Sequence, residues 1–188
     1  MLLAGQTWWQ AFPWSLGSVI LAAVAIAVTI TIFLITRKRK TLDVEFIDDV
    51  RILSERASDM RDDIVVTVGK LQLKDPRILT VRYRNTGNQE IVADDFLGGG
   101  ITTTDKSGPV ITSQLVAVSD EAIHSVESGL APHKSYYVDC LNPGDYLQVQ
   151  YILDMAGADD KPFAPVCRVK GATRPPKYTS AGPAVAIP

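Results

Sequence analysis

The sequence predicts a mainly β protein in which one N-terminal transmembrane α-helix is followed by a single antiparallel β-sandwich. Two observations carry this prediction. Residues 16–36 form a long apolar run without charge, and the chain beyond it shows short strand-like segments separated by turn residues, with no long helical pattern. Short strands at close spacing with turn signals between them are typical of a β-sandwich.

The N-terminal apolar run has the length of a membrane span. Its core, residues 16–35, contains no charge and no proline. At about 1.5 Å per residue, such a helix crosses the roughly 30 Å hydrocarbon core of a bilayer. A cleaved signal peptide would have a basic N-terminal flank and a shorter core, whereas residues 1–15 contain no Lys or Arg. A buried helix of a soluble protein is rarely apolar on every face. We therefore predict a permanent transmembrane helix over residues 16–36.

The charges beside the span predict its orientation. Four basic residues follow it directly: Arg37, Lys38, Arg39 and Lys40. Lys and Arg next to a span are retained in the cytoplasm, so the predicted location is the cell membrane, single-pass, with residues 1–15 outside and the C-terminal domain cytoplasmic. We assign residues 37–42 to a basic juxtamembrane linker, whose four cations would lie against the anionic headgroups of the lipid bilayer.

The aromatic residues before the span fit the outer membrane interface. The chain has three tryptophans, and all precede or begin the apolar run: Trp8, Trp9 and Trp14. Indole rings favour the headgroup region, where the ring is half buried and its N–H stays hydrated. A peptide that recognises an extracytoplasmic partner is the alternative. Within the span, a stripe of small residues from Ser18 to Thr29 would permit a homo-oligomer.

The domain after the span is acidic. Of the 19 Lys and Arg residues in the chain, four flank the span, whereas all 21 Asp and Glu residues lie beyond it. This balance argues against nucleic acid as a partner and against the domain lying flat on anionic lipid. Cys140 and Cys167, the only cysteines, are expected to be reduced and mostly buried in a cytoplasmic domain. With the reverse topology, they would be candidates for a disulfide.

Turn residues divide residues 43–171 into the strands of the predicted sandwich. Candidate strands lie at residues 44–47, 64–68, 71–73, 78–84, 90–92, 101–104, 110–118, 135–140, 146–153 and 166–170. The clearest contains Leu79, Val81 and Tyr83, which alternate with polar residues. The run from Asn142 to Asp145, with Pro and Gly at its centre, predicts a tight antiparallel connection. Residues 172–188 are rich in proline, and we expect them to be disordered.

Three motifs in this domain resemble a loose group of uncharacterised bacterial proteins. The motifs are residues 79–88 (LTVRYRNTGN), residues 94–96 (DDF) and residues 141–145 (LNPGD). In that group, one N-terminal span precedes an immunoglobulin-like β-sandwich, and the same frame is similar to cell-adhesion-type bacterial domains. The resemblance covers about residues 41–171 and implies an immunoglobulin-like fold. Its motifs are turn sequences, so it implies no catalytic residues.

No motif predicts catalysis, a metal site or a cofactor. His124 and His133 lack the spacing to the cysteines that a zinc site needs. Ser125 beside His124 is adjacent in sequence only and does not make a triad. The glycines at residues 98–100 lack the lysine of a phosphate-binding loop. We therefore expect a protein that is not an enzyme. A hydrolase would require one of the histidines beside a carboxylate in a pocket.

A membrane sensor domain that responds to a small ligand or to calcium is the alternative function, and four Asp-Asp pairs are its candidate calcium ligands. The pairs are Asp48-Asp49, Asp62-Asp63, Asp94-Asp95 and Asp159-Asp160. Calcium takes six to eight oxygen ligands, so several of these pairs would have to converge. Asp is also favoured in turns for its bonds to the backbone.

The sequence therefore favours a membrane-tethered, non-enzymatic binding or scaffolding protein. Its acidic domain would meet a protein partner at the cytoplasmic membrane face through strand edges or loops, the usual recognition surfaces of such folds. Tethering would raise its effective concentration for other membrane components. The predicted contact residues lie in three loops: Asn88, Asp94, Asp95, Asn142 and Asp145.

Overall fold

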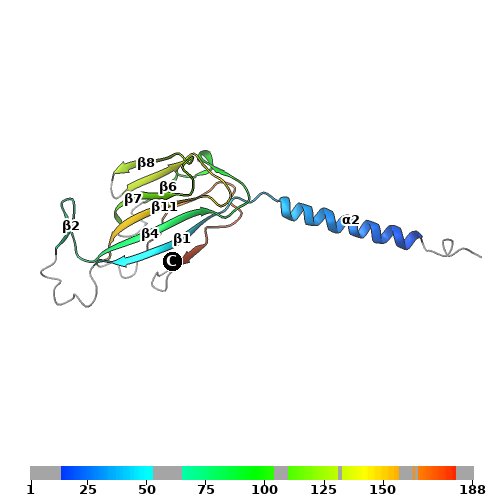
Figure 1. Cartoon of the computed structure of the whole chain (residues 1–188), viewed down its shortest axis with the longest axis horizontal. Helices are drawn as coiled ribbons and strands as arrows, with labels where there is room; N and C mark the ends of the chain where they lie inside the picture. The colour runs from blue at the N-terminus through cyan, green and yellow to red at the C-terminus, as the bar shows by residue number, and fades with distance from the viewer. Residues whose placement is uncertain are drawn as a thin grey trace, which may run out of the picture. The chain divides into compact units, whose positions relative to one another are not determined.

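The computed structural model describes residues 14–52, 65–103, 110–130, 133–156, 163 and 165–180. The chain divides between Lys38 and Arg39 into two compact units, and each is described here by itself. The prediction of a mainly β chain with one N-terminal apolar helix and antiparallel-rich sheets is confirmed (Figure 1).

The helix of the first unit is α2, Trp14–Thr36. Its segment Gly17–Thr36 is long and apolar enough to cross a membrane, and none of that segment is buried within the structure. The hydroxyls of Thr29, Thr31 and Thr36 each donate to the carbonyl four residues earlier, at 2.7–2.8 Å. Such bonds satisfy hydroxyls that would otherwise lack a partner in hydrocarbon.

The interfacial belt stays a prediction. Trp8 and Trp9 lie outside the described residues, and Trp14 is described only by its place at the first position of α2. The observed helix and the predicted span both end at Thr36. The C-terminal boundary of the apolar segment could therefore be read from the sequence alone, because the basic cluster follows at once.

The second unit is built on a five-stranded sheet with the order β12-β1-β4-β11-β7. Its members are β1 (Leu42–Arg51), β4 (Pro76–Asn85), β7 (Val110–Val118), β11 (Tyr146–Asp154) and β12 (Tyr178–Ser180). Neighbouring strands are antiparallel except for β1 and β12, which pair in parallel. Side chains along β11 alternate between half-buried and buried, as expected for a strand with one face on a core.

Three smaller sheets accompany the large one. The first pairs β2 (Val66–Val68) with β3 (Leu71–Leu73). The second pairs β5 (Ile91–Val92) with β10 (Cys140–Leu141). The third has the order β6-β9-β8, with β6 at Ile101–Thr102, β9 at His133–Val138 and β8 at Ser125–Leu130. One 3-10 turn, η2 (Ala93–Asp95), follows β5. Buried residues of the large sheet, such as Val81 and Val149, share one core with Tyr136 of β9 and Leu141 of β10.

Two tyrosines of this core bond to each other. Tyr83 on β4 and Tyr151 on β11 are fully buried, and their hydroxyl oxygens lie 2.7 Å apart. Burial raises the pKa of both phenols, so both are neutral across the physiological range. Each hydroxyl therefore satisfies the other in a region that excludes water.

Tyr83→Phe is expected to lower the free energy of unfolding by about 1–2 kcal/mol, because the Tyr151 hydroxyl would remain buried without its partner. The double variant Tyr83→Phe with Tyr151→Phe is expected to lose less than twice that amount, since no orphan hydroxyl is then left. Urea unfolding of the full chain in mild detergent, followed by the β-sheet circular dichroism signal, measures both. Strict additivity of the two substitutions would contradict the proposed pair.

The C-terminal segment differs from the sequence-based prediction. We expected disorder from residue 172 onward, but residues 172–180 are ordered and end in β12. The Val44 N–H donates to the Lys177 carbonyl at 3.0 Å, and the Tyr178 ring stacks on Phe46 with centroids 6.4 Å apart. Pairing and aromatic packing against β1 outweigh the low propensity of the prolines. Residues 181–188 lie outside the described part of the chain.

One strand assignment was wrong, and one strand was missed. Residues 166–170 were predicted to be a strand, but Val166 and Val169 form only isolated bridges, to Thr102 and Phe96. Strand β8 was not predicted at all. Its sequence, SVESGL, contains two serines and a glycine, so it lacks the alternation by which strands are recognised.

Candidate interaction surfaces

Two residues, Arg37 and Lys38, separate the end of helix α2 from the β domain, which begins at Arg39. The Arg39 N–H donates to Asn88 Oδ1 at 2.6 Å, and the Asn88 N–H donates back to the Arg39 carbonyl at 3.0 Å. The Thr86 N–H donates to the Thr41 carbonyl at 3.0 Å. We call residues 39–41 with their partners the entry clasp. Because of it, the predicted linker of residues 37–42 shortens to Arg37 and Lys38.

The entry clasp also contains an ion pair. Lys40 Nζ lies 2.5 Å from Asp95 Oδ2, and both side chains are largely buried. Burial would raise the pKa of Asp95, but the bonds from Lys40 and from the Val92 N–H lower it, so the carboxylate is charged. The expectation that all four cations face lipid headgroups therefore does not hold for Lys40, because its ammonium group pairs inside the domain.

The three loops that we expected to contact a partner meet at this same end of the domain. Asn88 and Asp95 both bond to the entry clasp. Asn85, at the end of β4, donates through Nδ2 to the Leu141 carbonyl at 2.8 Å and through its N–H to the Asp145 carbonyl at 2.9 Å. These bonds bring the turn at residues 142–145 beside the loop that contains Asn88.

Most of the predicted contact residues form hydrogen bonds that hold these turns in place. The Asp145 carboxylate accepts bonds from the Asn142 N–H at 2.8 Å and from Ser119 Oγ at 3.1 Å. Carboxylates and amides that bond to nearby backbone are typical of turns. Asp94 and Asn142 are exposed. The geometry thus explains Asn88, Asp95 and Asp145 as residues that hold turns, the alternative to partner contact for these loops.

The part of the chain that the structure describes offers no site for calcium. Among its residues, no group of three or more His, Cys, Asp or Glu side chains could hold a metal ion. Asp49 lies 3.3 Å from Arg77, and Asp95 is paired with Lys40. The pairs at residues 62–63 and 159–160 lie outside the described residues. No observation therefore favours the calcium-responsive alternative.

Among the described strands, β8 is the most exposed, and it lies at an edge of the three-stranded sheet β6-β9-β8 (Figure 1). Only one residue of β8 is half-buried, and the others are exposed. Val126 and Leu130 are 62% and 86% exposed, and Val126 pairs with Tyr137 of β9, which is 43% exposed. Residues opposite each other in a sheet share a face, so these three side chains form an exposed apolar stripe along the edge, which we call the β8 stripe.

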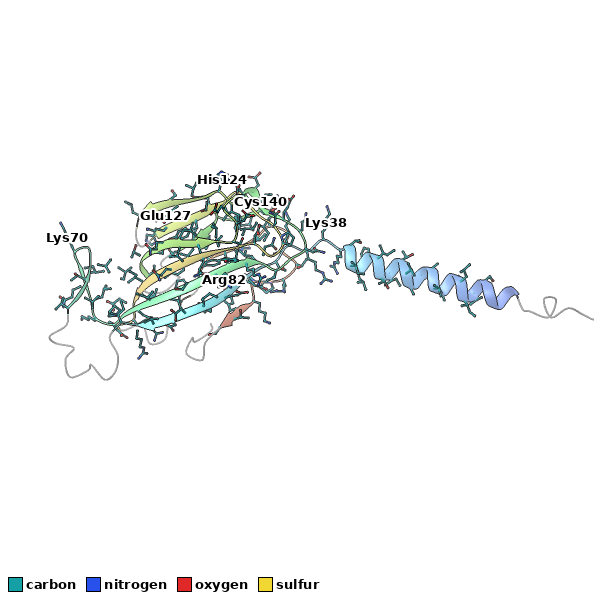
Figure 2. All side chains as sticks on the ribbon, viewed as in Figure 1. Lys38, Lys70, Arg82, His124, Glu127 and Cys140 are labelled. Carbon is teal, nitrogen blue, oxygen red and sulfur yellow. The ribbon has the colours of Figure 1, made fainter. Side chains whose placement is uncertain are left out.

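The two edges of the five-stranded sheet are better protected. β12 has only three residues. At β7, the Ser113 carbonyl accepts a bond from Lys134 Nζ at 2.6 Å, which covers part of that edge. β8 contains no Lys, Arg or Pro, the residues that commonly guard an edge. Its one charged side chain, Glu127, labelled in Figure 2, forms an ion pair with Lys134.

The two cysteines are free and differ in exposure. Cys167 is buried, and burial raises the pKa of its thiol to about 12. Cys140 is half-buried, and its pKa is raised by burial and then by the carboxylates of Glu90 and Asp139. Only a thiolate is a good nucleophile, so neither residue has the environment of a catalytic cysteine.

No family model, curated protein or solved structure matches this chain. The resemblance to bacterial proteins with an immunoglobulin-like domain therefore stays a prediction. The surfaces that bear on function are the β8 stripe and the end of the domain at which the chain enters.

Proposed function

We propose that the chain is a membrane-tethered, non-enzymatic binding protein that docks an extended segment of a partner protein onto β8. Helix α2 is the anchor, with the N-terminus outside and an immunoglobulin-like β-sandwich on the cytoplasmic side. The single observation that carries this proposal is the unguarded edge of β8 with its exposed apolar stripe. An exposed edge strand presents unpaired backbone N–H and C=O groups, and these can pair with a strand of another chain.

The chemistry of such docking follows from strand addition. Main-chain bonds along the edge supply affinity, whereas alternate side chains supply specificity. Val126 and Leu130 lie four residues apart on β8 and share one face. The partner segment should therefore place apolar side chains at alternate positions. Anchoring by α2 would keep the β8 edge at high effective concentration for partners in the same membrane.

Photo-crosslinking from the edge tests this docking. A photoreactive amino acid at position 126 or 130 of the full chain, expressed in its own cells, is expected to give one discrete adduct. The same probe at Leu71 serves as the matched control, since Leu71 is 51% exposed on another hairpin strand. We expect no such adduct from Leu71. The mass of the adduct distinguishes a different protein from a second copy of this chain.

Lysine substitutions on β8 provide a second test of docking. With the probe at position 128, Val126→Lys with Leu130→Lys is expected to abolish the adduct, because edge lysines oppose strand pairing. Val65→Lys with Leu71→Lys makes the same charge change at two other exposed apolar residues, and we expect it to leave the adduct intact. An adduct that survives the first pair, or that is lost equally with the second, would contradict docking at β8.

Thiol labelling tests the orientation. A membrane-impermeant maleimide is expected to leave Cys140 unlabelled in intact cells and to label it slowly after lysis at pH 8, because its raised pKa lowers the thiolate fraction. Cys167 is expected to react only after unfolding, since it is buried. Mass spectrometry of the labelled peptides separates the two sites. Labelling of Cys140 in intact cells would place the domain outside and overturn the cytoplasmic assignment.

A further inference from the structure

The basic residues of the β domain are not evenly distributed. Residues 165–180 contain four Lys and Arg residues and no Asp or Glu, although acidic residues outnumber basic ones in the chain. The four are Arg168, Lys170, Arg174 and Lys177. All four are exposed. The domain is acidic overall, and for that reason we expected it not to lie on anionic lipid. It nevertheless contains this basic segment.

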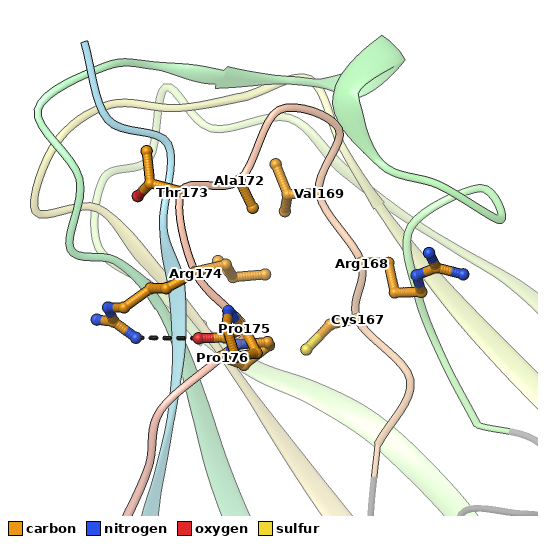
Figure 3. Close-up of a pocket in the computed structure, with 9 residues that line it drawn as sticks. Cys167, Arg168, Val169, Ala172, Thr173, Arg174, Pro175 and Pro176 are labelled. Carbon is orange, nitrogen blue, oxygen red and sulfur yellow. Dashed lines mark hydrogen bonds between the residues drawn. The ribbon is translucent and has the colours of Figure 1, made fainter. Parts of the chain in front are cut away.

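This basic segment borders a pocket of about 500 Å³ (Figure 3). The walls are largely apolar and include Leu42, Val169, Pro175 and Pro176. The Cys167 side chain lies against the same space, and Figure 3 shows the arginines at positions 168 and 174 on opposite sides of it, with both side chains directed away from the hollow. The volume falls within the roughly 300–1,000 Å³ range of small-molecule sites. An apolar hollow with cations at its rim suits an amphiphile with a negative head.

The rim of the pocket is bound to the residues that follow the helix. Ala172 forms a parallel bridge with Lys40, and the Thr173 N–H donates to the Lys40 carbonyl at 3.1 Å. Lys40 is four residues beyond Thr36, the end of α2. Four residues span at most about 14 Å when fully extended. If α2 spans the bilayer, chain connectivity alone therefore keeps Lys40, to which the rim is bonded, within about 14 Å of the end of the span.

We propose that this pocket binds an anionic phospholipid of the membrane in which α2 is anchored. The apolar walls would take part of an acyl chain or the glycerol backbone. The phosphate would stay at the exposed surface of the basic segment, where Arg168, Lys170 and Lys177 supply positive charge. Arg174 is held by Asp43 through two bonds of 2.7 and 2.6 Å, so it positions the segment and keeps the rim in place. The proposal rests on the membrane anchor of the proposed function and is independent of β8.

Lipid nanodiscs test this binding with the full chain. Hydrogen exchange of residues 165–177 is expected to be slower in nanodiscs containing phosphatidylglycerol than in nanodiscs of phosphatidylcholine alone. Arg168→Gln with Lys170→Gln is expected to raise the phosphatidylglycerol fraction needed for half-maximal protection by roughly 30-fold, since each cation near an anionic surface contributes about 1 kcal/mol. Lys70→Gln with Lys74→Gln makes the same charge change at two lysines that are not among the residues lining the pocket, and serves as the matched control.

The possible outcomes separate the proposals. Equal protection in both kinds of nanodisc, or an equal shift from the two double variants, would overturn the lipid site. Inorganic phosphate that protects residues 165–177 in phosphatidylcholine nanodiscs as fully as phosphatidylglycerol does would show an anion site instead and overturn it as well. A chain that fails to co-elute with nanodiscs would refute the anchor itself, whereas the β8 crosslinking reports on the docking surface alone.

Discussion

Asp43→Asn is expected to lower the free energy of unfolding of the β domain by about 3 kcal/mol, because it removes a charge on which four bonds converge. Asp43 accepts two bonds from Arg174, one from Thr86 Oγ1 at 2.7 Å and one from the Lys177 N–H at 2.9 Å. Its side chain is only 10% exposed. The amide of asparagine would keep the shape, but it would place N–H donors against donors.

The same carboxylate joins the two ends of the domain sequence. Asp43 belongs to β1, whereas Arg174 and Lys177 lie 131 and 134 residues further along the chain. Loss of these bonds is expected to release the segment before β12 as well as to lower global stability. Urea unfolding in mild detergent measures the stability, and hydrogen exchange of residues 172–180 measures the release.

Asp94→Asn is the matched control, since Asp94 is exposed, and we expect it to change stability by less than about 0.5 kcal/mol. Equal effects of the two substitutions would refute this role of Asp43.

A pH dependence follows from the same bonds. Burial would raise the pKa of Asp43, but the bonds from Arg174, Thr86 and Lys177 lower it below its ordinary value of 3.8. A carboxyl group whose pKa is lower in the folded state contributes stability that is present above pH 3.8 and lost as the pH falls through the folded pKa. Stability of the wild-type domain should therefore decline below about pH 4, and Asp43→Asn should flatten that decline. Asp95 contributes in the same direction.

Local patterns could be read from the sequence where they follow from a single segment. The end of α2 follows from the switch from apolar to basic residues, and β4 follows from the alternation of Leu79, Val81 and Tyr83. The turn at residues 142–145 follows from its Pro-Gly centre, and Gly144 has the positive φ that such a turn needs. In each case, the physical cause lies within a few residues.

Other features depend on partners far away in the chain. Lys40 is not a headgroup contact, because Asp95, 55 residues later, holds it. The order of residues 172–180 depends on Asp43 and Phe46 of β1. No local pattern reveals these partners, so the sequence alone suggested a longer linker and a disordered tail. The exposed edge of β8 was missed for the opposite reason, since its own sequence is a weak strand former and β9 holds it in place.

Gly87→Ala is expected to lower the free energy of unfolding by about 3 kcal/mol, because there is no room for the added methyl group. A Cβ at position 87 would lie 2.2 Å from the Arg39 carbonyl oxygen and 3.0 Å from the Thr41 backbone nitrogen. Both atoms belong to the backbone of the entry clasp and cannot rotate away as the end of a side chain could. The substitution must therefore displace residues 39–41 from the loop that contains Asn88.

Gly69→Ala separates this steric effect from backbone strain. Gly69 has a φ of +64° and open space around its Cβ position, so alanine there meets only the cost of a left-handed conformation, about 1 kcal/mol. Gly87→Ala should lower the free energy of unfolding more than Gly69→Ala does in urea unfolding, and it alone should speed hydrogen exchange of residues 39–42.

Release of residues 39–42 would lengthen the tether beyond the two residues that now join α2 to the domain. Under the proposed lipid site, the protection of residues 165–177 should then weaken with Gly87→Ala and persist with Gly69→Ala, because a longer tether would hold the pocket less closely to the anchored helix. If exchange at residues 39–42 is unchanged in Gly87→Ala, the clasp does not set the length of the tether.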